Sequence, residues 1–158
     1  HLTPFDFDKN FIPAEGVDQF MTGTPPILSL AALDEALDLF VDIDMKQLQK
    51  KHMLLSEYFL DRVQQYSELN DLQLASTRNA NKRGAQLSFS HPEAHAICRA
   101  WDEAGVKADF RSPDLLRVGF SPLVLGFAEL ELAVKALADI VGNETFAESR
   151  FQRRLKVT

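Results

Sequence analysis

An arginine interrupts an apolar, strand-like run near residue 117. By alternation, Arg117 is expected on the face that also carries Leu115 and Gly119. A guanidinium there must reach solvent, pair with an acid or bind a carboxylate ligand, and its planar fork suits a bidentate carboxylate. Glycine at position 119 would leave room for such a ligand. An ion pair with Asp109 or Asp114 is the competing interpretation, and the spacing alone leaves both open.

A second candidate site precedes a predicted helix. Gly23 and Thr24 stand just before Pro25 and Pro26, where the apolar periodicity of a helix begins. Backbone N–H groups and a hydroxyl at the positive end of a helix dipole suit a phosphate or a carboxylate. The plainer interpretation is that Thr24 serves only as the N-cap of that helix.

The remaining reactive side chains suggest no chemistry of their own. The histidines are His1, His52, His91 and His95, and His91 and His95 have no third ligand at metal spacing, so we predict no metal site. Cys98 lies in a predicted helix among apolar residues, which favours a buried and unreactive thiol. The sequence also has no GxGxxG, GxxxxGK[ST] or GxSxG motif, so nucleotide-binding and serine-hydrolase sites have no support.

The elements that must position these residues follow from hydrophobic periodicity. The pattern predicts helices over 27–40, 44–69, 92–105 and 127–141, and strands over 72–76, 85–89, 106–110 and 116–120. Asp44 is expected to cap the second helix. Four short strands with helices on one face predict an α+β two-layer sandwich whose small sheet is mostly antiparallel. The tail after Asn143 is expected to be mobile or docked on the surface.

Size and charge narrow the function classes. The 158 residues suffice for one domain, and the net charge of −6 disfavours nucleic acids and anionic membranes as partners. No apolar run reaches the roughly 18 residues of a membrane span. A single cysteine fits a reducing compartment. The first 25 residues show no helical period, which favours a segment that packs on something absent and hence a chain lacking its N-terminal part.

The order of motifs along the chain resembles the C-terminal part of the kynureninase family. These enzymes are fold-type-I pyridoxal-phosphate proteins of the aminotransferase class V group. The resemblance covers roughly residues 1–142, and its specific parts are GTPPI and DFRSPDLLRVGFSPL, while RGAQLSFSH lies between them. The bacterial branch of the family is the more similar one.

The resemblance implies an activity and roles for particular residues. Kynureninases hydrolyse L-kynurenine to anthranilate and L-alanine in tryptophan catabolism and NAD biosynthesis, as cytoplasmic homodimers with pyridoxal 5′-phosphate. By matching motifs, Arg117 would bind the substrate α-carboxylate. Gly23 and Thr24 would contact the cofactor phosphate of the neighbouring subunit. His1 matches the last residue of the family's Trp-x-Gly-His motif and would lie near the substrate.

The resemblance also implies a division of the chain. Residues 1–26 would belong to, or pack on, a large cofactor-binding domain, and residues 27–158 would form the small C-terminal domain with a long interdomain helix. In this family the Schiff-base lysine belongs to the large domain, and no lysine here has a matching context, so no catalytic residue is expected and the piece alone would be inactive. Val124 stands where related enzymes often have tyrosine.

Two other functions remain open from the sequence. The chain could belong to another class V enzyme, such as a desulfurase or an aminotransferase. It could also be a non-catalytic α+β domain that binds a partner through its hydrophobic face.

Overall fold

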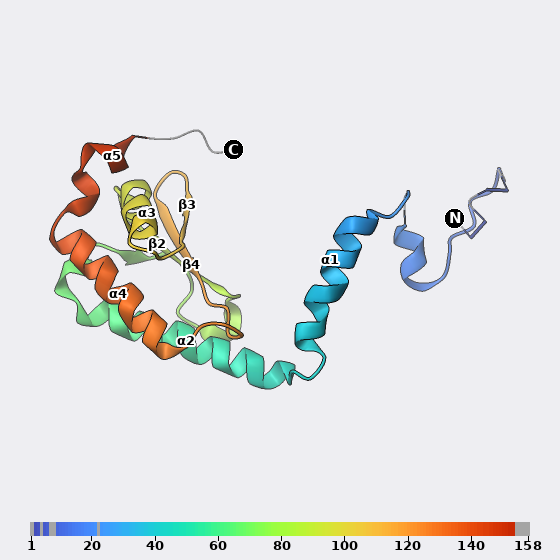
Figure 1. Cartoon of the computed structure of the whole chain (residues 1–158), viewed down its shortest axis with the longest axis horizontal. Helices are drawn as coiled ribbons and strands as arrows, with labels where there is room; N and C mark the ends of the chain where they lie inside the picture. Colours follow the sequence, from blue (N-terminus) through green and yellow to red (C-terminus); the bar gives the residue numbers. More distant parts are fainter. Residues whose placement is uncertain (1, 4, 7–8, 22, 154–158) are drawn as a thin grey trace. The chain divides into compact units, whose positions relative to one another are not determined.

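The computed structural model describes residues 2–3, 5–6, 9–21 and 23–153. The chain divides into two compact units, His1–Ile43 and Asp44–Thr158 (Figure 1). The assignment of residues 1–26 to a separate large domain remains a prediction. Among the described residues, no helix combines the length and the apolar character needed to cross a membrane.

The first unit is largely irregular and has one longer helix. It contains the 3-10 helix η1 (Gly16–Phe20), the helix α1 (Ile27–Leu37) and the 3-10 turn η2 (Asp38–Phe40). The helix predicted to reach residue 40 therefore ends three residues earlier and tightens into a 3-10 turn. None of the residues of these three elements is buried, although α1 carries the predicted apolar periodicity.

The second unit contains the remaining helices and the strands. Its helices are α2 (Met45–Gln65), α3 (Ala94–Glu103), α4 (Phe127–Gly142) and α5 (Ser149–Gln152). Its strands are β1 (Gln73–Leu74), β2 (Gln86–Ser90), β3 (Asp109–Arg111) and β4 (Leu115–Gly119). Short 3-10 turns lie at Ser67–Leu69, Ala80–Lys82 and Thr145–Ala147. The second predicted helix thus ends near residue 65 and its last turn is 3-10.

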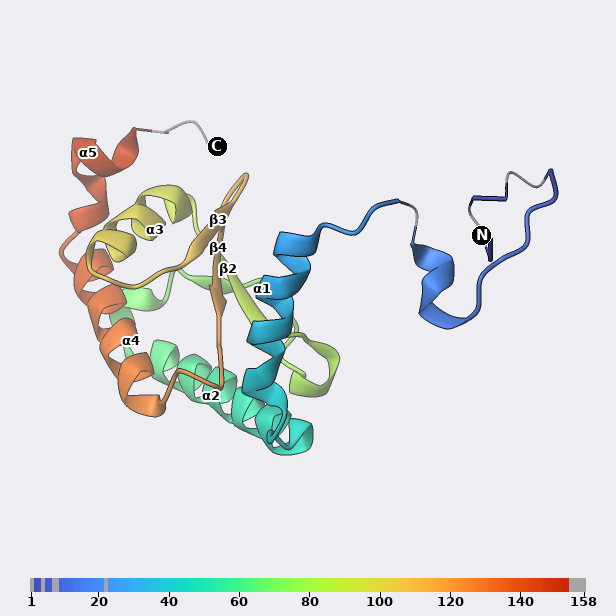
Figure 2. The same ribbon diagram turned by 45° about the vertical axis from the view of Figure 1, so that its right-hand side comes forward.

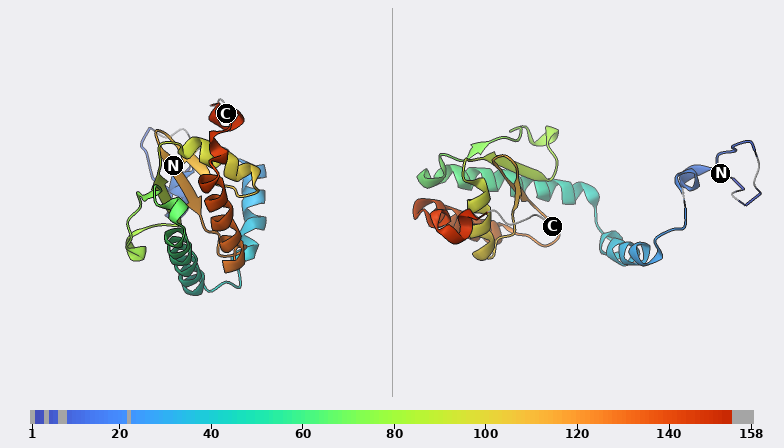
Figure 3. Two further views of the ribbon diagram at one scale, coloured as in Figure 1. Left: turned by 90° about the vertical axis from the view of Figure 1, so that its left-hand side faces the viewer. Right: turned by 90° about the horizontal axis from the view of Figure 1, so that it is seen from above.

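The four strands form one antiparallel sheet in the order β1-β2-β4-β3. Alternation along β2 and β4 buries four apolar side chains on one face of this sheet: Leu87, Phe89, Leu116 and Val118. That face packs against Phe59 of α2 and Trp101 of α3, both almost completely buried. Figure 2 views the sheet nearly edge-on, with α3 and α4 on one side, and Figure 3 shows α2 and α4 side by side. The predicted α+β fold with helices on one face of the sheet is confirmed.

Helix ends follow the local sequence. Asp44 caps α2 as predicted, since one carboxylate oxygen accepts hydrogen bonds from the backbone N–H of Lys46 at 2.8 Å and of Gln47 at 3.4 Å. Beyond α3, Gly105 has a φ of +91°, which a glycine adopts without steric cost and which ends the helix.

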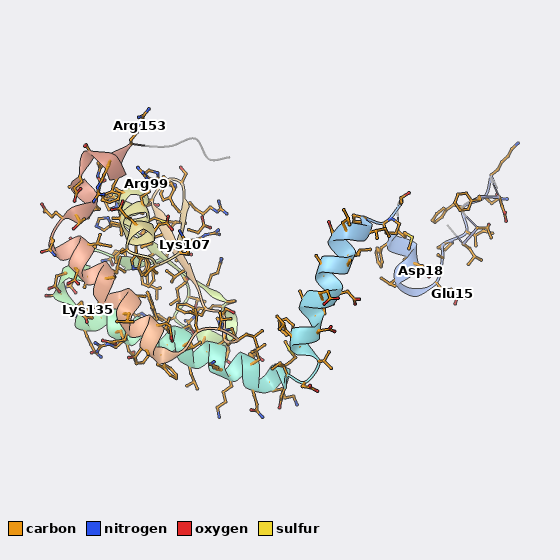
Figure 4. All side chains as sticks on the ribbon, in the orientation of Figure 1. Glu15, Asp18, Arg99, Lys107, Lys135 and Arg153 are labelled. Atoms are coloured by element: carbon orange, nitrogen blue, oxygen red, sulfur yellow. The ribbon has the colours of Figure 1, made fainter. Side chains whose placement is uncertain are left out.

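The C-terminal segment is docked on α3 as far as residue 153. Phe151 is buried, and Arg99 Nη1 donates hydrogen bonds to the carbonyl oxygens of Phe151 at 3.3 Å and Arg153 at 3.0 Å. Figure 4 shows Arg99 on α3 and Arg153 at the end of α5. This part of the tail is surface-docked, one of the two predicted states; residues 154–158 lie outside the described residues.

Candidate functional site

Strand β4 places Arg117 on the polar face of the sheet. Its neighbours Leu116 and Val118 are buried on the core face, so the pleat directs the Arg117 side chain to the opposite side. The ladder sets Arg117 directly opposite Ser88 of β2 and Asp109 of β3. A serine, an arginine and an aspartate therefore form one polar row across the sheet.

Arg117 and Asp109 form an ion pair in this row. Arg117 Nε donates to Asp109 Oδ2 at 3.1 Å, and Arg117 Nη2 contacts the same oxygen. Arg111 follows Asp109 by two residues on the same face, and its Nη2 lies 3.3 Å from that oxygen. The three side chains are 24%, 42% and 57% exposed in the order Arg117, Asp109, Arg111. Two cations and one anion leave the group with one net positive charge.

The ion pair leaves donors available for a ligand. A guanidinium has five N–H donors in a planar fork, and Asp109 engages the edge formed by Nε and Nη2. In the described part of the chain no acceptor is hydrogen-bonded to Nη1 of Arg117. The ion pair of the competing interpretation is present, with Asp109 rather than Asp114 as the partner. It leaves the end of the fork able to accept a carboxylate, so the ligand role of Arg117 stays a prediction.

Gly119 lies beside this row and is exposed. A Cβ atom at this position would meet only the carbonyl oxygen of Ala85, at 3.9 Å, which is an ordinary contact. Packing within the described chain therefore does not require glycine here. The room for a ligand beside Arg117 stays a prediction.

Gly23 and Thr24 lie in the first unit and are both exposed. The N-cap of α1 is Pro26, so Thr24 precedes the cap by two residues and the interpretation of Thr24 as the N-cap is wrong. Two backbone N–H groups and a hydroxyl are donors that suit phosphate oxygens. Lys9 is the one lysine or arginine among residues 1–43, so a phosphate held here would need cations from another part of the protein. His1 lies outside the described residues.

The other reactive residues have structural partners. His52 Nδ1 lies 3.2 Å from the carbonyl oxygen of Phe120, and His91 Nδ1 accepts from the backbone N–H of Glu93 at 3.0 Å. Cys98 is buried as predicted, and burial raises the pKa of its thiol to about 11, which favours an unreactive cysteine. Across residues that the structure describes, no group of three His, Cys, Asp or Glu side chains could hold a metal ion.

Two arginines were missed by the sequence interpretation. Arg111 joins the group around Asp109, and the signal was the alternation of Asp109 and Arg111 in one strand. Arg83 lies in the connection between the strands predicted over 72–76 and 85–89, where a solvent-exposed side chain is the usual expectation, yet its side chain is only 4% exposed. It donates to Ser56 Oγ at 2.9 Å and to the carbonyl oxygens of Thr77 and Arg78 at 3.1 Å, so it fastens loop 77–84 to α2.

The fold and the polar row define a class of protein. The second unit is a small α+β domain that presents a held guanidinium, with an excess positive charge, on the more exposed face of an antiparallel sheet.

Comparison with known proteins identifies the family. The family described as Kynureninase C-terminal domain matches residues 48–137, and the chain belongs to this family. The chain is 37% identical to a kynureninase of Pseudomonas fluorescens over all 158 residues and 38% identical to one of Deinococcus radiodurans over 141 residues, which is 89% of the chain. It is also 34% identical, over all 158 of its residues, to a kynureninase of Burkholderia mallei.

The resemblance to bacterial kynureninases drawn from the motifs is thereby confirmed. The chain spans only 38% of the length of the Pseudomonas and Burkholderia relatives, and its match covers 34% of the Deinococcus relative.

Proposed function

We propose that this chain is the C-terminal part of a pyridoxal-phosphate-dependent kynureninase. The complete enzyme would hydrolyse L-kynurenine to anthranilate and L-alanine in tryptophan catabolism, as a cytoplasmic homodimer. The observation that carries the proposal is a held guanidinium on an exposed sheet face, in a chain similar to kynureninases along its whole length.

Arg117 is the proposed site of the substrate α-carboxylate. The end of its fork can donate two parallel hydrogen bonds to a carboxylate, which fixes both the position and the orientation of an amino-acid substrate. The net charge of +1 on Arg111, Asp109 and Arg117 matches one monoanionic carboxylate. Binding at this point would hold the substrate while its side-chain carbonyl is hydrated and cleaved.

Gly23 and Thr24 are the proposed contacts to the cofactor phosphate, in the site of the neighbouring subunit. Their backbone N–H groups and the Thr24 hydroxyl are suitable donors, and a Cβ atom at Gly23 would meet nothing within 4 Å, so a phosphate could approach the backbone closely. When bound, pyridoxal phosphate supplies the electron sink for carbon–carbon cleavage. His1 is proposed to contribute to binding of the substrate.

The chain by itself is proposed to be inactive. None of its lysines stands in a context that matches the Schiff-base lysine of the family. The chain would contribute the carboxylate site and a phosphate contact, and the remaining part of the enzyme would contribute the reactive lysine.

The test is a kinetic assay of the full-length protein with L-kynurenine, in which released anthranilate is followed by its fluorescence. Arg117→Ala should lower kcat/KM by a factor that corresponds to about 2–4 kcal/mol of lost transition-state stabilisation, the cost of losing a charge-assisted bidentate contact. The matched control is Arg150→Ala, which removes an exposed arginine paired with Glu103 and Glu148 and should leave kcat/KM unchanged.

Two results would contradict the proposal. If the wild-type protein binds pyridoxal phosphate but releases no anthranilate from L-kynurenine, it catalyses a different reaction of the class V enzymes. Unchanged kinetics in Arg117→Ala would remove this arginine from the substrate site.

A further inference from the structure

We propose that Asp109 is the positioning residue of the carboxylate site, because it holds one edge of Arg117 so that the end of the guanidinium faces the ligand. This inference rests on the proposed function, since it takes the substrate carboxylate as the ligand of Arg117. Asp109 itself would not touch the substrate.

The pairing of β3 with β4 fixes the positions of Asp109 and Arg117 relative to each other. Asp109 and Arg117 are direct cross-strand partners, and the adjacent pair Phe110 and Leu116 also faces each other in register. Leu116 is completely buried, so the strand that carries Arg117 cannot slide without exposing core. Asp109 has a short side chain, and its oxygen therefore has a nearly fixed position over β4.

The contact engages a particular edge of the guanidinium. Both Nε and Nη2 of Arg117 donate to the same oxygen, Asp109 Oδ2. Two of the five donors are thereby used and three remain, one on Nη2 and two on Nη1. One remaining donor on each of these two nitrogens points along the end of the fork, and this parallel pair is the geometry that a carboxylate binds bidentately.

Asp109 also has a partner on its own strand. Arg111 Nη2 lies 3.3 Å from Asp109 Oδ2 and approaches the oxygen that holds Arg117. This second cation offsets the negative charge that Asp109 brings to the site, so holding Arg117 does not cost the site its attraction for an anion. If Asp109 did not hold Arg117, binding of the carboxylate would also have to order a long and flexible side chain.

The test measures the preference of the full-length protein, loaded with cofactor, for a carboxylate over a carboxamide. L-alanine and L-alaninamide are titrated by calorimetry into the wild type, Asp109→Ala, Asp109→Asn and Arg117→Ala. The preference is the ratio of the two dissociation constants. The matched control is Asp102→Ala, which removes an exposed aspartate that pairs with Lys107 on the surface.

Asp109→Ala should lower the preference for L-alanine by about tenfold, because Arg117 is no longer oriented by Asp109. A change of this size corresponds to the loss of one charge-assisted hydrogen bond. Asp109→Asn keeps an oxygen that can accept from Nε, so its preference should stay within about threefold of wild type. Should Asp109→Ala fail to fold, Asp109→Glu takes its place, because the longer side chain keeps the charge but displaces the oxygen and should also lower the preference.

Some outcomes would overturn the inference and others would overturn the proposed function. If Asp109→Ala and Asp109→Asn both bind L-alanine more tightly than wild type, Asp109 acts only as a competing charge. If Asp109→Ala loses thermal stability but keeps the full preference, Asp109 is only a structural partner. If Arg117→Ala keeps the wild-type preference, Arg117 does not bind the carboxylate. This result overturns the proposed function itself, whatever the Asp109 variants show.

Discussion

Arg62 of α2 and Glu131 of α4 form a two-point ion pair across the helix interface. Arg62 Nε donates to Glu131 Oε2 and Nη2 to Oε1, each at 2.6 Å. Tyr58 adds a third hydrogen bond from its hydroxyl to Oε2 at 2.9 Å. The hydrogen bonds from Arg62 and then Tyr58 lower the pKa of Glu131 below its ordinary value of 4.5.

The lowered pKa predicts how the contribution of Glu131 to stability depends on pH. An acid whose pKa is depressed by folding stabilises the folded state above its unfolded pKa and loses this contribution as pH falls through its folded pKa. Glu131→Gln should therefore be less stable than wild type at pH 7, and the difference should shrink progressively below about pH 4.5. Urea denaturation of the full-length protein across this range measures it. Asp139→Asn on the same helix is the control, and an equal difference at every pH would contradict the prediction.

Replacing Trp101 by a smaller residue is predicted to cost far more stability than truncating an exposed residue of α4. It is completely buried, and its indole N–H donates to the carbonyl oxygen of Ala133 on α4 at 3.0 Å. Trp101→Phe removes both this hydrogen bond and part of the ring volume, so the free energy of unfolding should fall by about 2–3 kcal/mol. Leu132→Ala, on the exposed side of α4, should change it by less than about 0.5 kcal/mol. Equal losses in the two variants by chemical denaturation would contradict this ranking.

Cys98 should be nearly inert in the folded protein. Its thiol has a pKa of about 11, raised chiefly by burial, so about one molecule in a thousand carries the thiolate at pH 8. A disulfide reagent such as Ellman's reagent should react slowly with the native chain and at the rate of a free cysteine in urea. Rapid labelling of the native chain at pH 8 would show that the thiol is accessible and ionised.

Gly119→Ala should separate binding from folding. The added methyl group would meet only one backbone oxygen at 3.9 Å, so the free energy of unfolding should change by no more than about 0.5 kcal/mol. The same methyl group would stand on the face that carries Arg117, in the room proposed for the substrate, so KM for L-kynurenine should rise. Gly84→Ala is the control, because a Cβ there meets nothing within 4 Å. A Gly119→Ala enzyme with unchanged KM would place the substrate elsewhere.

Much of the second unit could be predicted from local patterns. Alternation predicted strands over 85–89 and 116–120, where the structure has β2 and β4 with Leu87 and Leu116 completely buried. Asp44 was correctly predicted to cap the second helix. These features depend on side-chain period and capping chemistry, which act over a few residues. The confirmed resemblance to kynureninases also depends on short motifs, which are contiguous in the sequence.

Apolar periodicity predicted helices more reliably than it predicted which of their residues are buried. The residues of α1 follow a helical period, yet none of them is buried in the described structure. Met45 also follows the apolar pattern of its helix but is 59% exposed, whereas Leu55 in the same helix is completely buried. A period shows that a helix has an apolar face, but burial depends on what packs against that face.

The chain's residues alone therefore determined the family, the α+β class and the face of the sheet on which Arg117 lies. Tertiary structure decided the partner of that arginine, because Asp109 and Asp114 were equally available until strand pairing set Asp109 directly opposite it. It also brought Arg111 to the same oxygen. The physical reason is that the direction of a side chain follows from the local pleat, whereas the register of the β3–β4 hairpin depends on its turn at residues 112–114 and on the burial of Leu116 against the core.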